Sequence, residues 1–232
     1  VERKYNHILD TATSLAHLLK ERGINMLLFK GLNLSQLYPI PAHREFGDID
    51  IYLFGKHKEG NLLLDEVAVK NKGSNHYKHS NYYYRNIMIE NHAFLLNVHD
   101  SNKIARLNQT LLYMLGSEEV IQHSQEVPFL FPSPNFTALF FIIHATKHLT
   151  DAPLPLRTYC DWALFLQAYK DKIDIDKWQD DLRQAEMLPV AEALTSLTFK
   201  WMDGVGISPF TTGNHSELEE FITRETLYPS YT

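Results

Sequence analysis

The sequence predicts an α+β protein in which a region of short strands and helices, residues 1–131, precedes an all-helical region, residues 132–232. Three observations support this prediction. Before residue 131, short apolar and β-branched runs alternate with helix-like spacings of apolar residues. After residue 136 the apolar spacing is helical throughout. Between the two regions stand Pro128, Pro132 and Pro134, and prolines interrupt both helices and strand ladders.

The first elements follow from hydrophobic spacing and from residues that stop helices. Residues 8–21 carry apolar side chains at helical intervals, and Arg22-Gly23 ends this helix. The apolar run 24–29 predicts a short buried strand, and Lys30-Gly31 opens a short helix that extends to residue 37. The loop Tyr38-Pro39-Ile40-Pro41 comes next, because each proline lacks the N–H that a helix needs and disfavours helix in the residue before it.

The rest of the first region and the helical region follow from the same periodicities. Residues 48–53 predict a strand, and residues 58–70 predict a helix. Aromatic and β-branched stretches at 82–84 and 87–96 predict an antiparallel pair that turns at Arg85-Asn86. The other predicted elements are a helix over 103–115, a hairpin over 120–130, and helices over 136–149, 157–169, 175–185, 189–202 and 216–223.

Composition is that of an ordinary globular protein and limits the possible partners. The net charge is −6 and the basic residues are scattered, which argues against a nucleic-acid polymer as partner. No run approaches the roughly 18 apolar residues that span a membrane, and the first residues are polar and charged, so we expect neither a membrane span nor a signal peptide. The single cysteine, Cys160, fits a small buried side chain better than a nucleophile. A lone cysteine also fits a reducing compartment, so we expect a cytoplasmic protein.

Asp48 and Asp50 interrupt an otherwise apolar predicted strand. Side chains alternate along a strand, so both aspartates point to one face while Ile49 and Ile51 point into the core. Their Cα atoms are then about 7 Å apart, and a divalent cation can sit between such carboxylates and relieve their repulsion. A pair of surface aspartates is the alternative, but aspartate is a poor strand former, which favours a functional pair.

A third carboxylate, Glu90, lies in a later predicted strand, with His92 two residues on and hence on the same face. Two-metal nucleotidyl transfer usually needs such a carboxylate from a neighbouring strand. Asn91 would point to the opposite face, where an apolar residue is commoner. From the residues alone, Glu90 could equally be exposed to solvent and His92 a satisfied polar side chain.

Six short motifs follow one another in a fixed order over residues 10–170. They are Lys30-Gly31-Leu32, Tyr38-Pro39-Ile40-Pro41, Arg44-Glu45-Phe46-Gly47-Asp48-Ile49-Asp50, Ile89-Glu90-Asn91-His92, His144-Ala145-Thr146-Lys147-His148 and Leu156-Arg157-Thr158-Tyr159-Cys160-Asp161. In this order they resemble the bacterial uncharacterised nucleotidyltransferase family, a branch of the polymerase β-like superfamily. The resemblance implies a polymerase β-like core in the first region, with a small mixed sheet and flanking helices, followed by a helical domain.

The resemblance also implies roles for individual residues. Asp48, Asp50 and Glu90 would be the catalytic and metal-binding carboxylates, with Mg²⁺, or alternatively Mn²⁺, as the cofactor and Glu90 as the candidate base. Lys30-Gly31 stands where better-known superfamily members carry Gly-Ser; N–H groups at a helix N-terminus bind phosphate oxygens, and Lys30 would add a charge for the triphosphate. Arg44 would clamp a phosphate or carboxylate, with an ordinary loop arginine as the alternative.

The other residues that the resemblance implies in nucleotide binding are His92, His144, Lys147, His148, Arg157 and Asp161. His144 and His148 lie one helical turn apart, but no glutamate follows the first histidine as in a zinc-binding H-E-x-x-H motif, so we do not expect zinc. A nucleotide-contacting face and a helix–helix interface both remain open for this pair. Arg157 and Asp161 are also one turn apart and could simply pair with each other.

The resemblance therefore implies an enzyme that transfers a nucleoside monophosphate from an NTP, with ATP as the expected donor, to a hydroxyl acceptor and releases pyrophosphate. The acidic net charge favours a small molecule or a protein side chain as acceptor over a nucleic acid. The alternative function is that of a catalytically silent nucleotide-binding or regulatory protein, antitoxin-like, that kept the fold. A degenerate module should have lost at least one of Asp48, Asp50 and Glu90, and all three are present.

Overall fold

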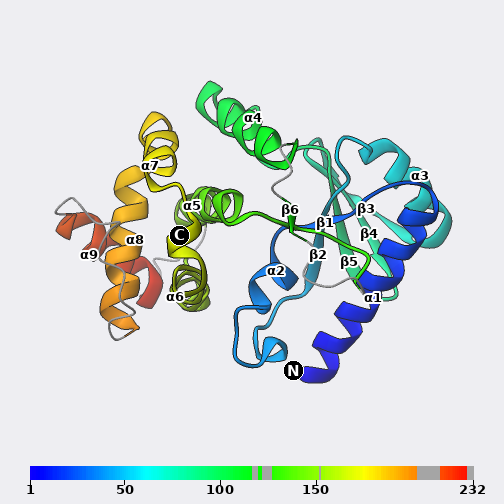
Figure 1. The fold of residues 1–232 in the computed structure, drawn as a ribbon, viewed down its shortest axis with the longest axis horizontal. Coiled ribbons are helices and arrows are strands. Elements are labelled where there is room, and N and C mark those ends of the chain that lie inside the picture. The colour runs from blue at the N-terminus through cyan, green and yellow to red at the C-terminus, as the bar shows by residue number, and fades with distance from the viewer. Residues whose placement is uncertain (117–119, 122–126, 152, 203–214, 229–232) are drawn as a thin grey trace. The chain divides into compact units, whose positions relative to one another are not determined.

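A five-stranded mixed sheet organises residues 1–133 in the computed structural model of the chain (Figure 1). The structure describes residues 1–116, 120–121, 127–151, 153–202 and 215–228. Across the sheet the strands are β1 (Leu27–Leu28), β2 (Asp48–Tyr52), β5 (Ile87–His92), β4 (His79–Tyr84) and β3 (Val69–His76). The pair β2 and β5 is parallel and the other neighbouring pairs are antiparallel.

Helices complete this first unit and make up the second, residues 134–232. The first unit contains α1 (Glu2–Glu21), α2 (Gly31–Ser35), a 3₁₀ turn (Pro41–His43), α3 (His57–Val67), α4 (Asn102–Gly116) and a short ladder of β6 (Val120–Ile121) with β7 (Phe131–Pro132). The second contains α5 (Pro134–Asp151), α6 (Arg157–Tyr169), a 3₁₀ turn (Lys170–Lys172), α7 (Ile175–Gln184), α8 (Leu188–Trp201) and α9 (Ser216–Leu227). The predicted fold class, an α+β core followed by helices, is confirmed.

One face of the sheet is buried by α1 and α3. Their apolar side chains share a single cluster with those of the central strands, and burial of each large apolar side chain stabilises the fold by about 1.5–3 kcal/mol. The cluster includes Ile8, Leu15, Leu19, Ile49, Ile51, Leu63, Leu64, Tyr82 and Ile89. Because strand side chains alternate, the residues between these isoleucines point to the opposite face of the sheet. That opposite face carries Asp50, Glu90 and His92.

Two predicted chain reversals are confirmed, and each depends on left-handed backbone. Gly23 has φ 67°, and the N–H groups of Gly23 and Ile24 donate to the carbonyls of Lys20 and Leu19, which closes the C-terminus of α1. Arg85 and Asn86 have φ 51° and 65°, as a tight two-residue hairpin between β4 and β5 requires. The second turn sets the antiparallel register in which Asn81 faces Glu90 and His79 faces His92.

The largest correction concerns β3, which the hydrophobic pattern did not reveal. The predicted helix 58–70 ends at Val67, and Val69–His76 is instead an edge strand paired with β4. Its sequence, VKNKGSNH, is polar and contains a glycine, so it shows no alternation of apolar and polar residues. An edge strand of this kind is held by its backbone hydrogen bonds to the neighbouring strand, which a periodicity in the sequence cannot report.

Other element boundaries differ more modestly. Of the predicted strand 24–29 only Leu27–Leu28 pairs in the sheet, and the strand predicted over 87–96 ends at His92. Residues 120–121 pair with Phe131–Pro132, whereas residues 122–126 of the predicted hairpin lie outside the described residues. α1 begins at Glu2 rather than at residue 8, and α2 ends at Ser35 rather than at residue 37.

The second unit has its own aromatic core. The indole of Trp162 is fully buried, stacks on Phe141 at 4.9 Å between ring centroids, and donates from Nε1 to Thr195 Oγ1 at 2.9 Å. Phe141 belongs to α5, whose residues from Phe136 to Ile143 are all buried. Among the described residues, no helix combines the length and the apolar character needed to cross a membrane.

We predict that Gly60→Ala destabilises the first unit. A Cβ at residue 60 would overlap with Leu53 Cδ1 and lie 3.1 Å from Asn91 Nδ2, in the buried contact between α3 and the sheet. Overpacking of this kind lowers the free energy of unfolding by about 1–3 kcal/mol, which urea denaturation measures. The matched control is Gly116→Ala, whose Cβ would meet nothing within 4 Å. A Gly60→Ala protein as stable as the wild type would contradict this packing.

Candidate active site

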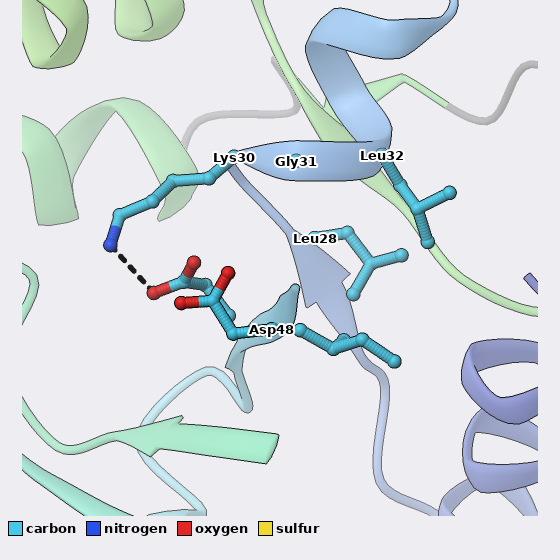
Figure 2. Close-up of a pocket in the computed structure, with 7 residues that line it drawn as sticks. Leu28, Lys30, Gly31, Leu32 and Asp48 are labelled. Atoms are coloured by element: carbon cyan, nitrogen blue, oxygen red, sulfur yellow. Dashed lines mark hydrogen bonds and ion pairs between the residues drawn. The ribbon is translucent and has the colours of Figure 1, made fainter. Parts of the chain in front are cut away.

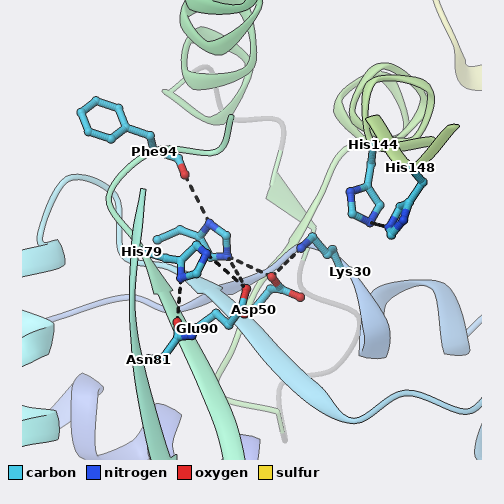
Figure 3. A network of polar contacts seen from close by, with 9 residues as sticks. Lys30, Asp50, His79, Asn81, Glu90, Phe94, His144 and His148 are labelled. Atoms are coloured by element: carbon cyan, nitrogen blue, oxygen red, sulfur yellow. Dashed lines mark hydrogen bonds and ion pairs between the residues drawn. The ribbon is translucent and has the colours of Figure 1, made fainter. Parts of the chain in front are cut away.

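The parallel pairing of β2 with β5 brings the predicted carboxylates together. In this register Asp50 lies directly opposite Glu90, and Tyr52 lies opposite His92. Asp50 is only 5% exposed, Glu90 is partly buried, and Asp48 lies at the exposed start of β2. The expectation that Glu90 comes from a strand adjacent to that of the aspartates is therefore confirmed. Figure 3 shows the side chains of Asp50 and Glu90 converging with that of Lys30.

Asp50 is the centre of a network of charged side chains. The Lys30 ammonium donates to Asp50 Oδ1 at 2.6 Å, and His92 Nε2 lies 2.9 Å from the same oxygen (Figure 3). Burial by itself would raise the pKa of this carboxyl, but the Lys30 charge and the His92 ring together hold the pKa of Asp50 far below its ordinary value. The carboxylate is therefore ionised throughout the neutral range although almost no water reaches it.

His92 is fully buried and is held from both sides of its ring. Nδ1 lies 3.2 Å from the carbonyl oxygen of Phe94, and the ring meets that of Phe29 edge-on at 5.0 Å between centroids. Nε2 faces the carboxylates, 2.9 Å from Asp50 and 3.5 Å from Glu90 Oε2. The hydrogen bond from His92 outweighs partial burial and lowers the pKa of Glu90, which keeps this second carboxylate ionised as well.

The structure adds two residues that the sequence analysis missed. His79 and Asn81 lie on β4 opposite His92 and Glu90, and the His79 ring centroid is 5.1 Å from that of His92. His79 Nδ1 lies 2.6 Å from Asn81 Oδ1, and its Nε2 lies 4.0 Å from Glu90 Oε2. Burial is the main cause that lowers the pKa of His79, so its ring is predominantly neutral at pH 7. The predicted strand began at Tyr82 and therefore did not include either residue. The spacing of His79 and Asn81, two residues apart and hence on one face of a strand, could have indicated them.

The turn between β1 and α2 positions Lys30. Gly31 suits this turn, because a Cβ at this position would lie 2.8 Å from the Phe46 ring and the ring would have to shift. Arg44 is buried, donates to the Gly31 carbonyl at 3.2 Å, and places its guanidinium 5.8 Å from the centroid of the Phe46 ring. Arg44 thus braces the turn, and its predicted contact with a phosphate or carboxylate stays a prediction.

A pocket of about 180 Å³, a volume that includes adjoining open solvent, lies beside this turn (Figure 2). It is lined by Leu28, Lys30, Gly31, Leu32, Asp48, Ile49 and Asp50. Burial would lower the pKa of Lys30, but the Asp50 carboxylate outweighs it and raises that pKa above its ordinary value, so the ammonium is charged. α2 spans only five residues, so its N-terminus has few aligned peptide dipoles and the charge of Lys30 is the main attraction for an anion.

Three side chains of the site could together hold a metal ion. Asp50, Glu90 and His92 each offer a ligand atom, and these atoms lie within 4.8 Å of one another. Carboxylate oxygens are the ligands that Mg²⁺ prefers, so the donor set fits a divalent cation. The predicted set had Asp48 in the place of His92. The role of Asp48 as a metal ligand stays a prediction.

The remaining predicted residues belong to the second unit. On α5, His148 Nε2 lies 3.2 Å from His144 Nε2 (Figure 3), and Lys147 pairs with Asp151 at 2.9 Å. On α6, Arg157 is exposed at the first turn and Asp161 is buried one turn later. The predicted nucleotide contacts of His144, Lys147, His148, Arg157 and Asp161 stay predictions.

The core and its site define a class of protein. Acidic residues on adjacent parallel strands, beside a strand-to-helix turn that presents a lysine, suit metal-assisted transfer of a phosphate-containing group. Residues 1–203 match the family described as uncharacterised nucleotidyltransferase, and the chain belongs to this family. A comparison with curated proteins found no match. Membership of the family supports nucleotidyl transfer as the general activity, with an NTP as substrate.

We predict strong energetic coupling between Lys30 and Asp50. A double-mutant cycle of Lys30→Met and Asp50→Asn, measured by urea unfolding without divalent ions, should give a coupling of about 2 kcal/mol, because the hydrogen bond joins two charges and is largely buried. The matched control is the exposed pair of Arg22 and Glu66, which solvent screens and whose coupling should be much smaller. Equal coupling in the two pairs would contradict a special role for the buried one.

Proposed function

We propose that this protein transfers a nucleoside monophosphate from an NTP, with ATP as the expected donor, to a hydroxyl group of a small molecule or a protein side chain. Pyrophosphate is the other product. The observation that carries this proposal is the pairing of Asp50 with Glu90 on adjacent parallel strands, with the Lys30 ammonium 2.6 Å from Asp50. Membership of a nucleotidyltransferase family supports the same reaction.

The reaction would be an in-line displacement at the α-phosphorus. The acceptor oxygen forms a bond to this phosphorus, the bond from it to the bridging oxygen breaks, and the electron pair leaves with pyrophosphate. Glu90 is ionised in the neutral range, because His92 lowers its pKa, and we propose it as the base that takes the acceptor proton. Asp50 and Glu90 would hold a divalent ion, Mg²⁺ or Mn²⁺, which when bound would supply positive charge to offset the negative charge that develops in the transition state.

Lys30 would neutralise the triphosphate. Its side chain is 21% exposed and lines the pocket beside Asp48, so its ammonium can reach an anion there without crossing the core. In the structure the ammonium pairs with Asp50, whose negative charge a bound cation would also satisfy. We propose that Lys30 moves from Asp50 to the phosphates when the cation and the nucleotide bind. Arg44 and Gly31 would act indirectly, by holding the turn that carries Lys30.

The proposal predicts that both buried carboxylates are needed for turnover. With Mg²⁺ and α-labelled NTPs, the wild type should transfer label to a component of an acceptor pool of aminoglycoside-like alcohols and cellular proteins, and release pyrophosphate. Asp50→Asn and Glu90→Gln should each reduce the rate at least about 10²-fold, the scale on which loss of a general base or of charge stabilisation acts. The matched control, Glu59→Gln, alters an exposed glutamate of α3 and should leave the rate unchanged.

A second measurement separates the enzyme from a binding-only protein. NTP binding in the presence of Mg²⁺ should weaken in Asp50→Asn, because this carboxylate would hold the cation that the triphosphate contacts. If no acceptor pool is labelled, no pyrophosphate is released, and NTP binding is the same in Asp50→Asn and the wild type, the catalytic proposal is wrong. That outcome would favour the regulatory alternative, in which the fold is kept without turnover.

A further inference from the structure

The His92 ring has the setting of a metal-binding imidazole. A backbone carbonyl can only accept, so the contact of Nδ1 with the Phe94 oxygen at 3.2 Å assigns a proton to Nδ1. Nε2 faces the ionised carboxylates of Asp50 and Glu90, which also only accept, so without a metal this nitrogen donates to them. A cation bound between the carboxylates would displace that proton and take the lone pair of Nε2. Metal-ligating histidines almost always donate their other N–H to a carbonyl or carboxylate in this way, which fixes the tautomer and the ring orientation.

His79 repeats this arrangement on the neighbouring strand. Its Nδ1 lies 2.6 Å from the Asn81 side-chain oxygen, which can accept from it, and its Nε2 is directed to the Glu90 carboxylate at 4.0 Å. The register of β4 with β5 places His79 opposite His92 and Asn81 opposite Glu90, so both pairs lie on the same face of the sheet. Two carboxylate oxygens and two imidazole nitrogens therefore approach one another from three adjacent strands.

Nitrogen donors change which metal the site favours. Mg²⁺ takes oxygen ligands almost without exception, whereas first-row transition-metal ions accept mixed imidazole and carboxylate sets. We propose that Asp50, Glu90 and His92 bind one divalent ion, with His79 as an additional donor, and that this site selects a first-row transition-metal ion such as Mn²⁺ over Mg²⁺. This inference deepens the proposed function and rests on it for placing the catalytic cation at these carboxylates.

A different arrangement makes the opposite prediction. If His92 only pairs electrostatically with the carboxylates, as Lys30 does, the cation would contact oxygen atoms alone, and Asp48 would complete the site. The metal would then have no nitrogen ligand, and removal of His92 would not alter the preference between Mn²⁺ and Mg²⁺. The two arrangements thus differ in an observable that does not depend on catalysis.

The decisive experiment uses the wild-type protein with Mn²⁺ alone. Pulsed electron paramagnetic resonance of the protein-bound Mn²⁺ should show coupling to ¹⁴N, replaced by the ¹⁵N pattern when histidine is isotopically labelled. Because no residue is changed, the result is independent of whether a variant at the buried position 92 folds. Bound Mn²⁺ with no histidine nitrogen coupling, or no Mn²⁺ binding at all, would overturn the inference.

Metal titrations of variants test the selectivity. Free Mn²⁺ is measured by its resonance signal, and Mg²⁺ affinity by competition against Mn²⁺. His92→Gln should lower Mn²⁺ affinity at least about 10–100-fold, because loss of a ligand costs no less than loss of a residue that only orients one, and should lower Mg²⁺ affinity far less. His79→Gln should have a smaller effect in the same direction. The control is His17→Gln, at an exposed position on α1, which should change neither affinity.

The outcomes separate this inference from the proposed function. Label transfer with Mg²⁺, together with an unchanged ratio of Mn²⁺ to Mg²⁺ affinity in a folded His92→Gln protein, would reject the nitrogen ligand and leave the enzyme intact. Histidine coupling to bound Mn²⁺ without label transfer to any acceptor, with Mn²⁺ or Mg²⁺ supplied, would instead reject the catalytic proposal and leave the metal site.

Discussion

The burial of one carboxylate constrains the whole candidate site. Asp50 is almost inaccessible to solvent, and a buried ionised carboxylate is costly unless cations and hydrogen bonds surround it. Lys30 and His92 both contact its Oδ1 atom, from the β1–α2 turn and from the parallel strand β5. Each partner is itself held in place: Arg44 and Phe46 pack around the turn, and the Phe94 carbonyl orients the histidine ring.

The two faces of the sheet have different roles: one packs into the apolar core, and the other carries the side chains of the candidate site. Ile49, Ile51 and Ile89 join the apolar cluster beneath α1 and α3, while the residues between them face the other way. Asn91 is the exception on the inner face: it is fully buried, and its amide donates to the His57 carbonyl and to Asn61 Oδ1. α3 satisfies the amide donors of Asn91, whereas its Oδ1 is buried without a hydrogen-bond partner among the described residues. The strand therefore keeps its alternation and its side-chain directions.

The same geometry links the reaction to the choice of metal. In the proposed enzyme, Glu90 would accept the proton of the acceptor hydroxyl and the Lys30 ammonium would contact the triphosphate. Asp50 would bind the cation close to both residues. A cation at this position would take over the role that Lys30 has in the structure, so binding of the metal and release of the lysine would be coupled. Imidazole nitrogens beside the carboxylates would then bias the site toward transition-metal ions.

Much of this protein was predictable from local pattern. The division into an α+β region and a helical region, the shared face of Asp48 and Asp50, and the hairpin at Arg85-Asn86 all depend on residues close together in the sequence. Helical and strand periodicities, prolines and turn residues report such features directly. The ordered motifs pointed to the family that the comparison then matched over residues 1–203.

Only the tertiary structure showed the strand pairings and side-chain contacts that join residues distant in the sequence. β3 is polar and is a strand only because β4 pairs with it, so no alternation of apolar and polar residues in the sequence indicated this strand. The parallel register of β2 with β5 put Asp50 opposite Glu90, and the pairing of β4 brought His79 into the site. We expected Lys30 to contact a triphosphate, but in the structure its ammonium pairs with Asp50. A buried carboxylate needs such a partner, and Lys30 is the nearest cation. The sequence alone identified the chemistry of the side chains, but only the pairing of the strands determined which of them meet.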